Sequence, residues 1–330
     1  MIFEWQAQAW AAWAQLRERL AHAILIQSGE GLGEFEFAQA CAQSLLCEDP
    51  REDRRPCGAC RACNWFSLGN HPDFRLVVPE SMAPESREEG AEPAKKKSEQ
   101  IRIEQARELA DFLAVGTHRG GARVILVYPA DAMNANTQNA LLKNLEEPPP
   151  ATVFLLVTTQ AERLLATVRS RCLKLTLPFP PPDPVLRWLK EQGAAHPEAA
   201  LAAAGGSPLA ALRIATTEGD RLRFFERLSN PAFDPIALAD SVQGTPLWEL
   251  VAWLQRWSYD LLLTRLAGRV RYNPNQAAGI AECARRCDAA DIAAYLRRLA
   301  QARSLARHPL NARLFIEDLL LQYQRLVAQP

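Results

Sequence analysis

The sequence has no excess of charge of either sign. Its 330 residues include 38 Lys and Arg and 38 Asp and Glu, so the formal net charge is zero. This balance argues against a free-standing protein that binds nucleic acid through its overall charge, although it is compatible with a local basic patch.

A long hydrophobic run is also missing. No stretch approaches the roughly 18 apolar residues that a membrane-spanning helix needs, so we expect no membrane contact. The N-terminal segment is apolar, but Arg17, Glu18 and Arg19 interrupt it and no cleavage pattern follows, which argues against a signal peptide. Cysteines clustered at metal-ligand spacing, without a secretory signal, predict a cytoplasmic protein.

The length and pattern predict an α/β domain followed by helices. Apolar strands alternate with helices up to about residue 178, which predicts a parallel sheet covered on both faces. A charged stretch at 79–98 is predicted to be a flexible loop, and a proline-rich stretch marks the end of the sheet domain. The predicted strands are 23–27, 74–78, 124–128, 153–158 and 172–177, and the predicted helices are 1–22, 34–46, 101–115, 137–146 and 164–169.

The rest of the chain is predicted to be helical. A small unit at about 183–208 precedes a longer all-helical region, so the expected domains are 1–178, 179–208 and 209–330. Leu250, Leu254 and Trp257 keep helical spacing, as do Leu314, Leu319 and Tyr323, and most of these residues are expected to lie in the core or at the seams of a helix bundle.

Four of the eight cysteines lie within residues 47–63. Cys47, Cys57, Cys60 and Cys63 follow the pattern C-x9-C-x2-C-x2-C, and two consecutive x2 spacings are typical of a zinc site. Four thiolates leave zinc no free position for a substrate, so the predicted zinc module is structural. Buried cysteines, a disulfide or a redox motif are the alternatives.

A phosphate loop that lacks the usual lysine and the usual Ser or Thr is predicted after the first strand. The segment at 23–46 has the strand, glycine-rich turn and helix of a P-loop, with Ser28 at the first glycine and Gly31 and Gly33 in place. Glu34 stands where lysine pairs with phosphate, and Phe35 stands where Ser or Thr binds magnesium. A carboxylate repels phosphate and a phenyl ring binds no magnesium, so no functional ATP or Mg²⁺ site is expected.

The third predicted strand lacks its catalytic acids in the same way. It ends in Tyr128-Pro129, where an ATPase has acidic residues that hold magnesium, and Asp131 lies too far along to replace them. Two catalytic positions lost together indicate a nucleotidase scaffold that no longer hydrolyses.

These residues resemble the delta-prime family of bacterial DNA polymerase III clamp-loader subunits. The resemblance covers most of the chain. Besides the cysteine cluster, it rests on the following segments: HPDF at 71–74, NALLKNLEEPP at 139–149, ERLLATVRSRC at 162–172, GGSPL at 205–209 and NARLFIEDLL at 311–320. It implies an AAA+ RecA-like parallel sheet with the embedded zinc module, a small helical lid domain and a C-terminal helical collar domain.

The resemblance also implies a function. The chain is expected to be a stator-like, non-catalytic subunit of a DNA-directed DNA polymerase holoenzyme that helps load the sliding clamp onto primed DNA. Its implied partners are the tau/gamma-type ATPase subunits, the delta subunit, the clamp and, through the complex, DNA. Arg171, with Ser170, lies in a Ser-Arg-Cys motif that the family uses as an arginine finger toward a neighbour's ATP.

Two other functions stay open at this point. One is an active clamp-loader-type ATPase, against which Glu34, Phe35 and Tyr128 argue. The other is a zinc-dependent nucleic-acid-binding module, against which the zero net charge and the closed four-cysteine site argue. ATP turnover by the isolated chain and a salt-dependent DNA titration distinguish them.

Overall fold

A computed structural model describes residues 2–83, 98–118, 120–216, 218–306 and 311–328. The chain divides into two compact units, Met1–Pro181 and Pro182–Pro330. The first division therefore falls close to the predicted end of the sheet domain at residue 178. The further division at residue 208 stays a prediction.

The first unit is built on a parallel sheet of five strands, in the order β2-β3-β4-β1-β5. β1 and β4 lie in its middle, and both are buried along almost their whole length. The apolar runs of the sequence form these strands because both faces of the sheet are covered. Their bounds are β1 Ala23–Gln27, β2 Phe74–Val77, β3 Arg123–Val127, β4 Thr152–Thr158 and β5 Leu173–Thr176.

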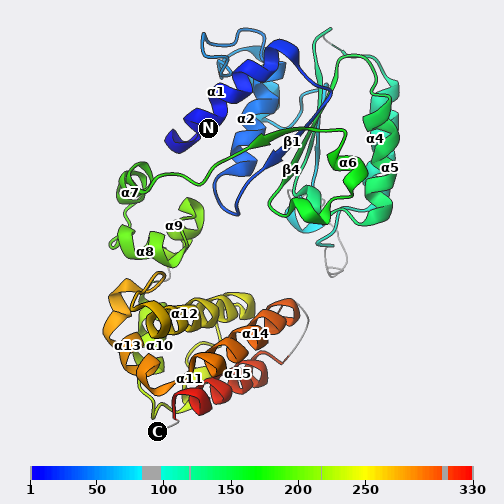
Figure 1. Ribbon diagram of the computed structural model, residues 1–330. Helices are drawn as coiled ribbons and strands as arrows, with labels where there is room; N and C mark the ends of the chain where they lie inside the picture. Colours follow the sequence, from blue (N-terminus) through cyan, green and yellow to red (C-terminus); the bar gives the residue numbers. More distant parts are fainter. Residues whose placement is uncertain (1, 84–97, 119, 217, 307–310, 329–330) are drawn as a thin grey trace, which may run out of the picture. The chain divides into compact units, whose positions relative to one another are not determined.

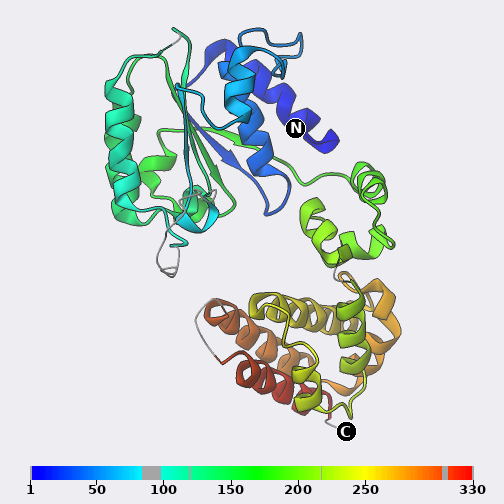
Figure 2. The same cartoon turned by 180° about the vertical axis from the view of Figure 1, so that it is seen from behind.

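Helices cover both faces of this sheet (Figure 1). Alternate residues along β1 illustrate the division: Ile24 and Ile26 pack into the core with α1 and α2, whereas Ala23 and Leu25 pack into the core with α4, α5 and α6. Figure 2 shows the same two layers from behind. The helices are α1 Ala7–Leu16, α2 Glu34–Leu46, α3 Arg61–Ser67, α4 Ile103–Ala114, α5 Ala135–Glu146 and α6 Ala166–Arg169, with short 3₁₀ turns η1 Glu4–Gln6, η2 Arg17–Arg19, η3 Glu80–Met82, η4 Ala130–Ala132 and η5 Ala161–Arg163.

The predicted elements of this unit are confirmed, with differences at their ends. The predicted helical segment at 1–22 is made of three successive elements, η1, α1 and η2, and it ends early, because Leu20 is already extended before β1. Of the predicted loop at 79–98, Glu80–Met82 forms a 3₁₀ turn and residues 84–97 lie outside the described residues.

The second unit is helical throughout its described part. Three short helices, α7 to α9, precede six more that share one hydrophobic core. The bounds are α7 Pro182–Glu191, α8 Pro197–Ala203, α9 Pro208–Thr216, α10 Glu218–Leu228, α11 Pro235–Asp240, α12 Leu247–Ala267, η6 Pro274–Gln276, α13 Ala277–Arg286, α14 Ala289–Leu305 and α15 Ala312–Val327.

Aromatic side chains of α10, α12 and α15 meet in this core. Phe225 stacks on Trp257 with 5.1 Å between ring centroids, and the indole N–H of Trp257 donates to the Tyr323 hydroxyl at 2.8 Å. The predicted core residues of α12 are buried. On α15 Leu319 is buried too, but Leu314 is 61% exposed, so that prediction is wrong for Leu314.

A buried carboxylate fastens the loop after α12. Asp260 is fully buried, and its oxygens accept hydrogen bonds at 2.8–3.1 Å from the backbone N–H groups of Arg271, Tyr272 and Asn273 and from the Asn273 side chain. The Tyr272 ring in turn lies against Gly205, where an added Cβ would be 3.2 Å from it. Asp260 thus fixes the loop against which the segment between α8 and α9 packs.

A membrane span requires a helix that is both long and apolar. None of the described helices alone has both properties. One sharply bent pair, α8 with α9, passes on length and composition only.

Candidate functional sites

The four clustered cysteines meet at one point between α2 and α3. The sulfur atoms of Cys47, Cys57, Cys60 and Cys63 all lie within 4.8 Å of one another, and none forms a disulfide. Sulfur–sulfur distances of 3.9 Å for Cys47–Cys60 and 4.0 Å for Cys57–Cys63 are close to the edge of about 3.8 Å expected for a tetrahedron with zinc–sulfur bonds of about 2.3 Å. These four residues could therefore hold a metal ion.

Backbone amides point at the same sulfur atoms. The N–H of Cys57 donates to Cys47 Sγ at 3.3 Å, that of Cys60 to Cys57 Sγ at 3.2 Å and that of Cys63 to Cys60 Sγ at 3.4 Å. Burial raises the pKa of Cys60, but the N–H of Cys63 and other donors outweigh it and lower the pKa to about 6. At Cys60 these donors favour the thiolate, which is the form of cysteine that binds metal, whereas burial raises the pKa of Cys47 and of Cys63.

Helix α1 and the η2 turn hold the loop between Cys47 and Cys57 in place. The Trp10 indole N–H donates to the carbonyl oxygen of Asp53 at 2.9 Å, and Arg17 donates to that of Arg54 at 3.2 Å. The loop therefore has anchors on the sheet domain that do not depend on a metal.

The degenerate phosphate loop joins β1 to α2 at the carboxyl end of the sheet. Gly31 and Gly33 have φ of 74° and 83°, a left-handed conformation that favours glycine, and Gly33 precedes the first residue of α2. The Ser28 N–H donates to the carbonyl oxygen of Thr158 at the end of β4, so the loop begins against the middle of the sheet. This is the geometry in which loop amides face an anion.

The anion facing these amides is the chain's own Glu34 carboxylate. Its oxygens accept hydrogen bonds from the N–H of Leu32 at 3.0 Å and from that of Gly31 at 3.4 Å, and the side chain is only 4% exposed. The sequence predicted that Glu34 repels phosphate. The structure adds that its carboxylate occupies the loop.

Tyr128, directly after β3, and Phe35 of α2 lie beside the Glu34 carboxylate and the phosphate loop. The Tyr128 hydroxyl lies 3.3 Å from Glu34 Oε1 and donates to it, and its ring stacks on Phe35 with 4.7 Å between centroids. Burial, together with the negative charge of Glu34, raises the pKa of Tyr128, so the hydroxyl keeps its proton. The two residues that the sequence predicted in place of magnesium ligands are thus aromatic rings stacked on each other.

Residues far away in sequence cover the loop. A Cβ added to Gly33 would lie 2.6 Å from the Phe3 ring, and one added to Gly29 would lie 2.6 Å from the Phe179 ring. The Gln6 side chain donates to the carbonyl oxygen of Gly33 at 2.8 Å. Sequence reasoning missed Phe3, Gln6 and Phe179, and no motif marks them.

Asp131 binds to the end of β4. It lies in η4 after β3 and accepts a hydrogen bond of 2.5 Å from the Thr158 hydroxyl and one of 3.3 Å from the Thr159 N–H. The carboxylate therefore ties β3 to β4.

Arg171 lies between α6 and β5 and is about one third exposed. Its Nη2 forms an ion pair of 2.6 Å with Glu146 at the end of α5, and its Nη1 donates to the carbonyl oxygen of Thr167 at 2.9 Å. The Ser170 hydroxyl donates to the same carbonyl group at 3.1 Å. Glu146 belongs to the NALLKNLEEPP segment, so the sequence marked the segment but not this contact.

The phosphate loop and Arg171 lie at opposite ends of the parallel strands. β5 runs parallel to β1 with Leu173 beside Ile24, so Arg171 lies near the amino end of β1, whereas the phosphate loop follows its carboxyl end. At about 3.3 Å per residue, the two ends of β1 are roughly 13 Å apart. Arg171 therefore cannot reach the phosphate loop of its own chain.

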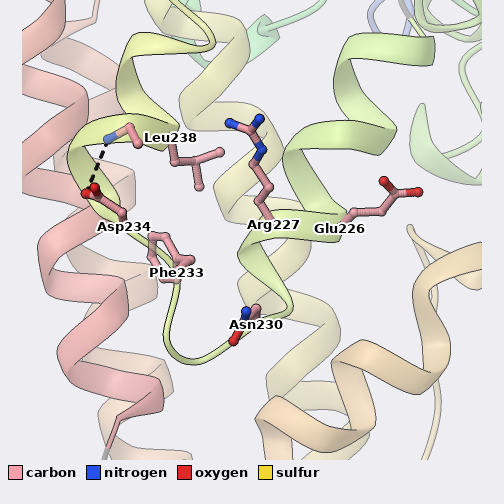
Figure 3. Close-up of a pocket in the computed structure, with 7 residues that line it drawn as sticks. Glu226, Arg227, Asn230, Phe233, Asp234 and Leu238 are labelled. Atoms are coloured by element: carbon pink, nitrogen blue, oxygen red, sulfur yellow. Dashed lines mark hydrogen bonds between the residues drawn. The ribbon is translucent and has the colours of Figure 1, made fainter.

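A hollow in the second unit involves neither site. It lies between the end of α10 and α11 (Figure 3). There the Asp234 carboxylate accepts hydrogen bonds from the first N–H groups of α11 at 2.9 and 3.3 Å, so its charge serves as a helix cap.

A parallel sheet in the order β2-β3-β4-β1-β5 with a glycine-rich turn after its first strand, followed by a helical unit, defines a P-loop-type α/β domain with a helical domain. Residues 6–181 match the family model described as DNA polymerase III, delta subunit, and residues 219–325 match the model of the C terminal part of that delta subunit. The chain belongs to the delta-prime family of DNA polymerase III subunits.

Curated relatives agree along most of the chain. The DNA polymerase III subunit delta' of Pseudomonas aeruginosa is 36% identical over 80% of this chain and 78% of its own length. That of Escherichia coli K12 is 32% identical over 94% and 90%. A solved gamma subunit-related protein of DNA polymerase III from Thermotoga maritima, 18% identical, aligns over 97% of this chain and 99% of its own with a TM-score of 0.49.

Proposed function

We propose that this chain is a non-hydrolysing subunit of a DNA polymerase III clamp loader. It acts in the cytoplasm with tau/gamma-type ATPase subunits and a delta subunit to load a sliding clamp onto primed DNA. Family membership supports its place in the clamp loader. The observation that carries the non-hydrolysing role is the phosphate loop whose amides already bind Glu34.

The alternative, an active clamp-loader ATPase, lacks the groups that hydrolysis requires. The loop presents a carboxylate in place of lysine, and the magnesium positions hold the stacked rings of Phe35 and Tyr128. Purified chain should not turn over ATP in the presence of magnesium. Turnover that disappears on substitution of Gly33 would instead establish the ATPase.

We also assign Arg171 as an arginine finger directed at a neighbouring ATPase subunit. Its position away from its own phosphate loop supports action in trans. The partly exposed ion pair with Glu146 contributes only about 0.2–1 kcal/mol, so phosphate oxygens can replace it at small cost. A guanidinium carries a permanent charge and contacts two phosphate oxygens at once.

Substitution of Arg171 in the reconstituted clamp loader tests this role. Arginine fingers contribute about 10³–10⁵ in rate, so Arg171→Ala should strongly lower DNA- and clamp-stimulated ATP hydrolysis at the adjacent site. Arg171→Lys should restore only part of it, because an ammonium group cannot contact two oxygens in the same planar fork. Exposed Arg163 in η5 is the matched control, and Arg163→Ala should assemble and hydrolyse as wild type does.

If Arg171→Ala complexes assemble and load clamps at the wild-type rate, the assignment is wrong. Folding of the variant is checked by its assembly, since the substitution removes a partly exposed charge and no core volume.

The metal of the four-cysteine site is proposed to be structural zinc. Four thiolates at tetrahedral spacing suit zinc, and they leave it no vertex for a substrate. Zinc would fix the chain between α2 and α3 and take no part in chemistry.

The region after residue 208 is proposed to be the collar that joins the ring, and 179–208 the lid. Helix α12 supports a collar role, because Trp248, Tyr259 and Leu266 are 48%, 37% and 69% exposed. Their spacing places them along one side of the helix. An exposed apolar stripe of this kind is typical of a surface that packs against another subunit.

A further inference from the structure

The phosphate loop binds a buried carboxylate, that of Glu34, which has no role in ATP hydrolysis. Glu34 is the first residue of α2, and its side chain turns back onto the two residues before Gly33. A buried charge is stable only when it is paired or hydrogen-bonded, and here the loop amides provide the bonds. The buried Glu34 carboxylate therefore depends on these hydrogen bonds, because an unpaired charge in the core would destabilise the fold.

We propose that the Glu34 carboxylate is a built-in anionic ligand of the phosphate loop, which holds the loop in its anion-bound conformation without nucleotide. The N-terminal end of the thirteen-residue helix α2 favours negative charge. Left-handed Gly31 and Gly33 aim the amides at the same point, and the Tyr128 hydroxyl donates to the carboxylate from β3. The carboxylate thus takes the hydrogen bonds that phosphate oxygens take in a working loop.

The N-terminal segment stabilises the same conformation from outside. The Gln6 amide donates to the carbonyl oxygens of Leu32 and Gly33 at 3.0 and 2.8 Å, and the Trp5 indole N–H donates to that of Leu32 at 3.0 Å. Because these carbonyl groups are held from η1, the amides of the loop stay directed at Glu34. Both the amides and the carbonyl groups of the loop are thus bound by the chain itself.

The inference deepens the proposed function, on which its relevance to the clamp loader rests. A loop that carries its own anion has the same conformation whether ATP is present or absent. The subunit then contributes a constant surface to the ring while its neighbours change with their nucleotides. The test uses the isolated full-length chain and does not depend on the other subunits.

The experiment measures amide hydrogen exchange at Gly31 and Leu32 by NMR. In wild type both amides should be protected, and millimolar inorganic phosphate should not change their exchange. In Glu34→Ala exchange should rise about tenfold, the change expected for loss of one charge-assisted hydrogen bond, and phosphate should slow it again. Glu36, in the same turn of α2, is the matched control, and Glu36→Ala should exchange as wild type does.

A second variant protects the test against misfolding. Glu34→Gln keeps the shape of the side chain and removes its charge, so exchange should be intermediate and phosphate should still slow it. Equal exchange in Glu34→Ala and Glu36→Ala would overturn the proposal, as would exchange that phosphate fails to slow in both Glu34 variants. ATP turnover by wild type would refute the non-hydrolysing role separately, since the exchange experiment contains no nucleotide.

Discussion

Removal of the Asp260 carboxylate should destabilise the helical unit more than any surface substitution. Asp260 is fully buried and serves three successive backbone N–H groups and the Asn273 side chain. Asp260→Ala would leave the two Asn273 donors buried without a partner, because Asn273 is only 3% exposed. A buried unsatisfied donor costs about 1–3 kcal/mol, so the expected loss is roughly 2–6 kcal/mol.

Such a loss is a large part of the roughly 5–15 kcal/mol that stabilises a typical domain. Urea unfolding followed through the NMR signals of the buried Trp253 and Trp257 indoles measures it. With an m value of about 2 kcal/mol/M, a loss of about 4 kcal/mol lowers the midpoint by about 2 M. Asp260→Asn should also destabilise, because its amide presents donors where the loop requires acceptors.

The exposed carboxylate of Asp291, in the first turn of α14, provides the matched control. Asp291→Ala should cost less than about 1 kcal/mol, as expected for a charge near a helix N-terminus. If Asp260→Ala unfolds within about 1 kcal/mol of this control, the reasoning about the buried donors is refuted.

Three further predictions concern the two sites of the first unit. A chelator should increase proteolysis within residues 47–63, since structural zinc contributes roughly 10–16 kcal/mol of binding free energy in small peptides. The sheet should stay folded, because this domain has its own core. Zinc retained by the Cys60→Ser, Cys63→Ser double variant in elemental analysis would exclude the assigned ligands. Glu34→Lys should not restore ATP turnover, because the magnesium ligands are still missing, and a turnover assay that finds hydrolysis would contradict this. Gly33→Ala should lower the unfolding midpoint by the equivalent of about 1–3 kcal/mol, since its Cβ would lie 2.6 Å from the Phe3 ring on a left-handed backbone, and an unchanged midpoint would show that the N-terminal segment is not held there.

Much of the sheet domain follows from local patterns. The inner strands β1, β3 and β4 are mainly apolar and buried along almost their whole length, because both faces of the sheet are covered there. The predicted ends of all five strands agree with the structure to within one residue. The end of the helical segment at 1–22 was harder to predict, because Leu20 keeps helical spacing with Leu16 although the backbone is already extended at Leu20. Leu314 shows the same limit, since helical spacing assigns a residue to a face but does not reveal whether another element covers it.

The candidate sites divide in the same way. The cysteines, Glu34 and Phe35 carry their chemistry in spacing along the chain, so the sequence identified them. Phe3 and Phe179 contact the loop only through tertiary structure, and no local pattern could have placed them. Asp260 is one charged residue in a long helix, and only the fold brings the loop amides to it.

Because Arg171 lies away from the phosphate loop, the two sides of this subunit that face its neighbours in a ring are not equivalent. Under the proposed function, the chain donates a charge to the neighbour on one side and has no use for an arginine offered from the other. In a head-to-tail ring, a subunit of this kind stands at one end of the series of ATP sites, because it completes its neighbour's site and has no working site of its own. Removing an arginine that a neighbour directs at this subunit's own phosphate loop should therefore change nothing, whereas removing Arg171 should strongly lower hydrolysis at a site of another chain.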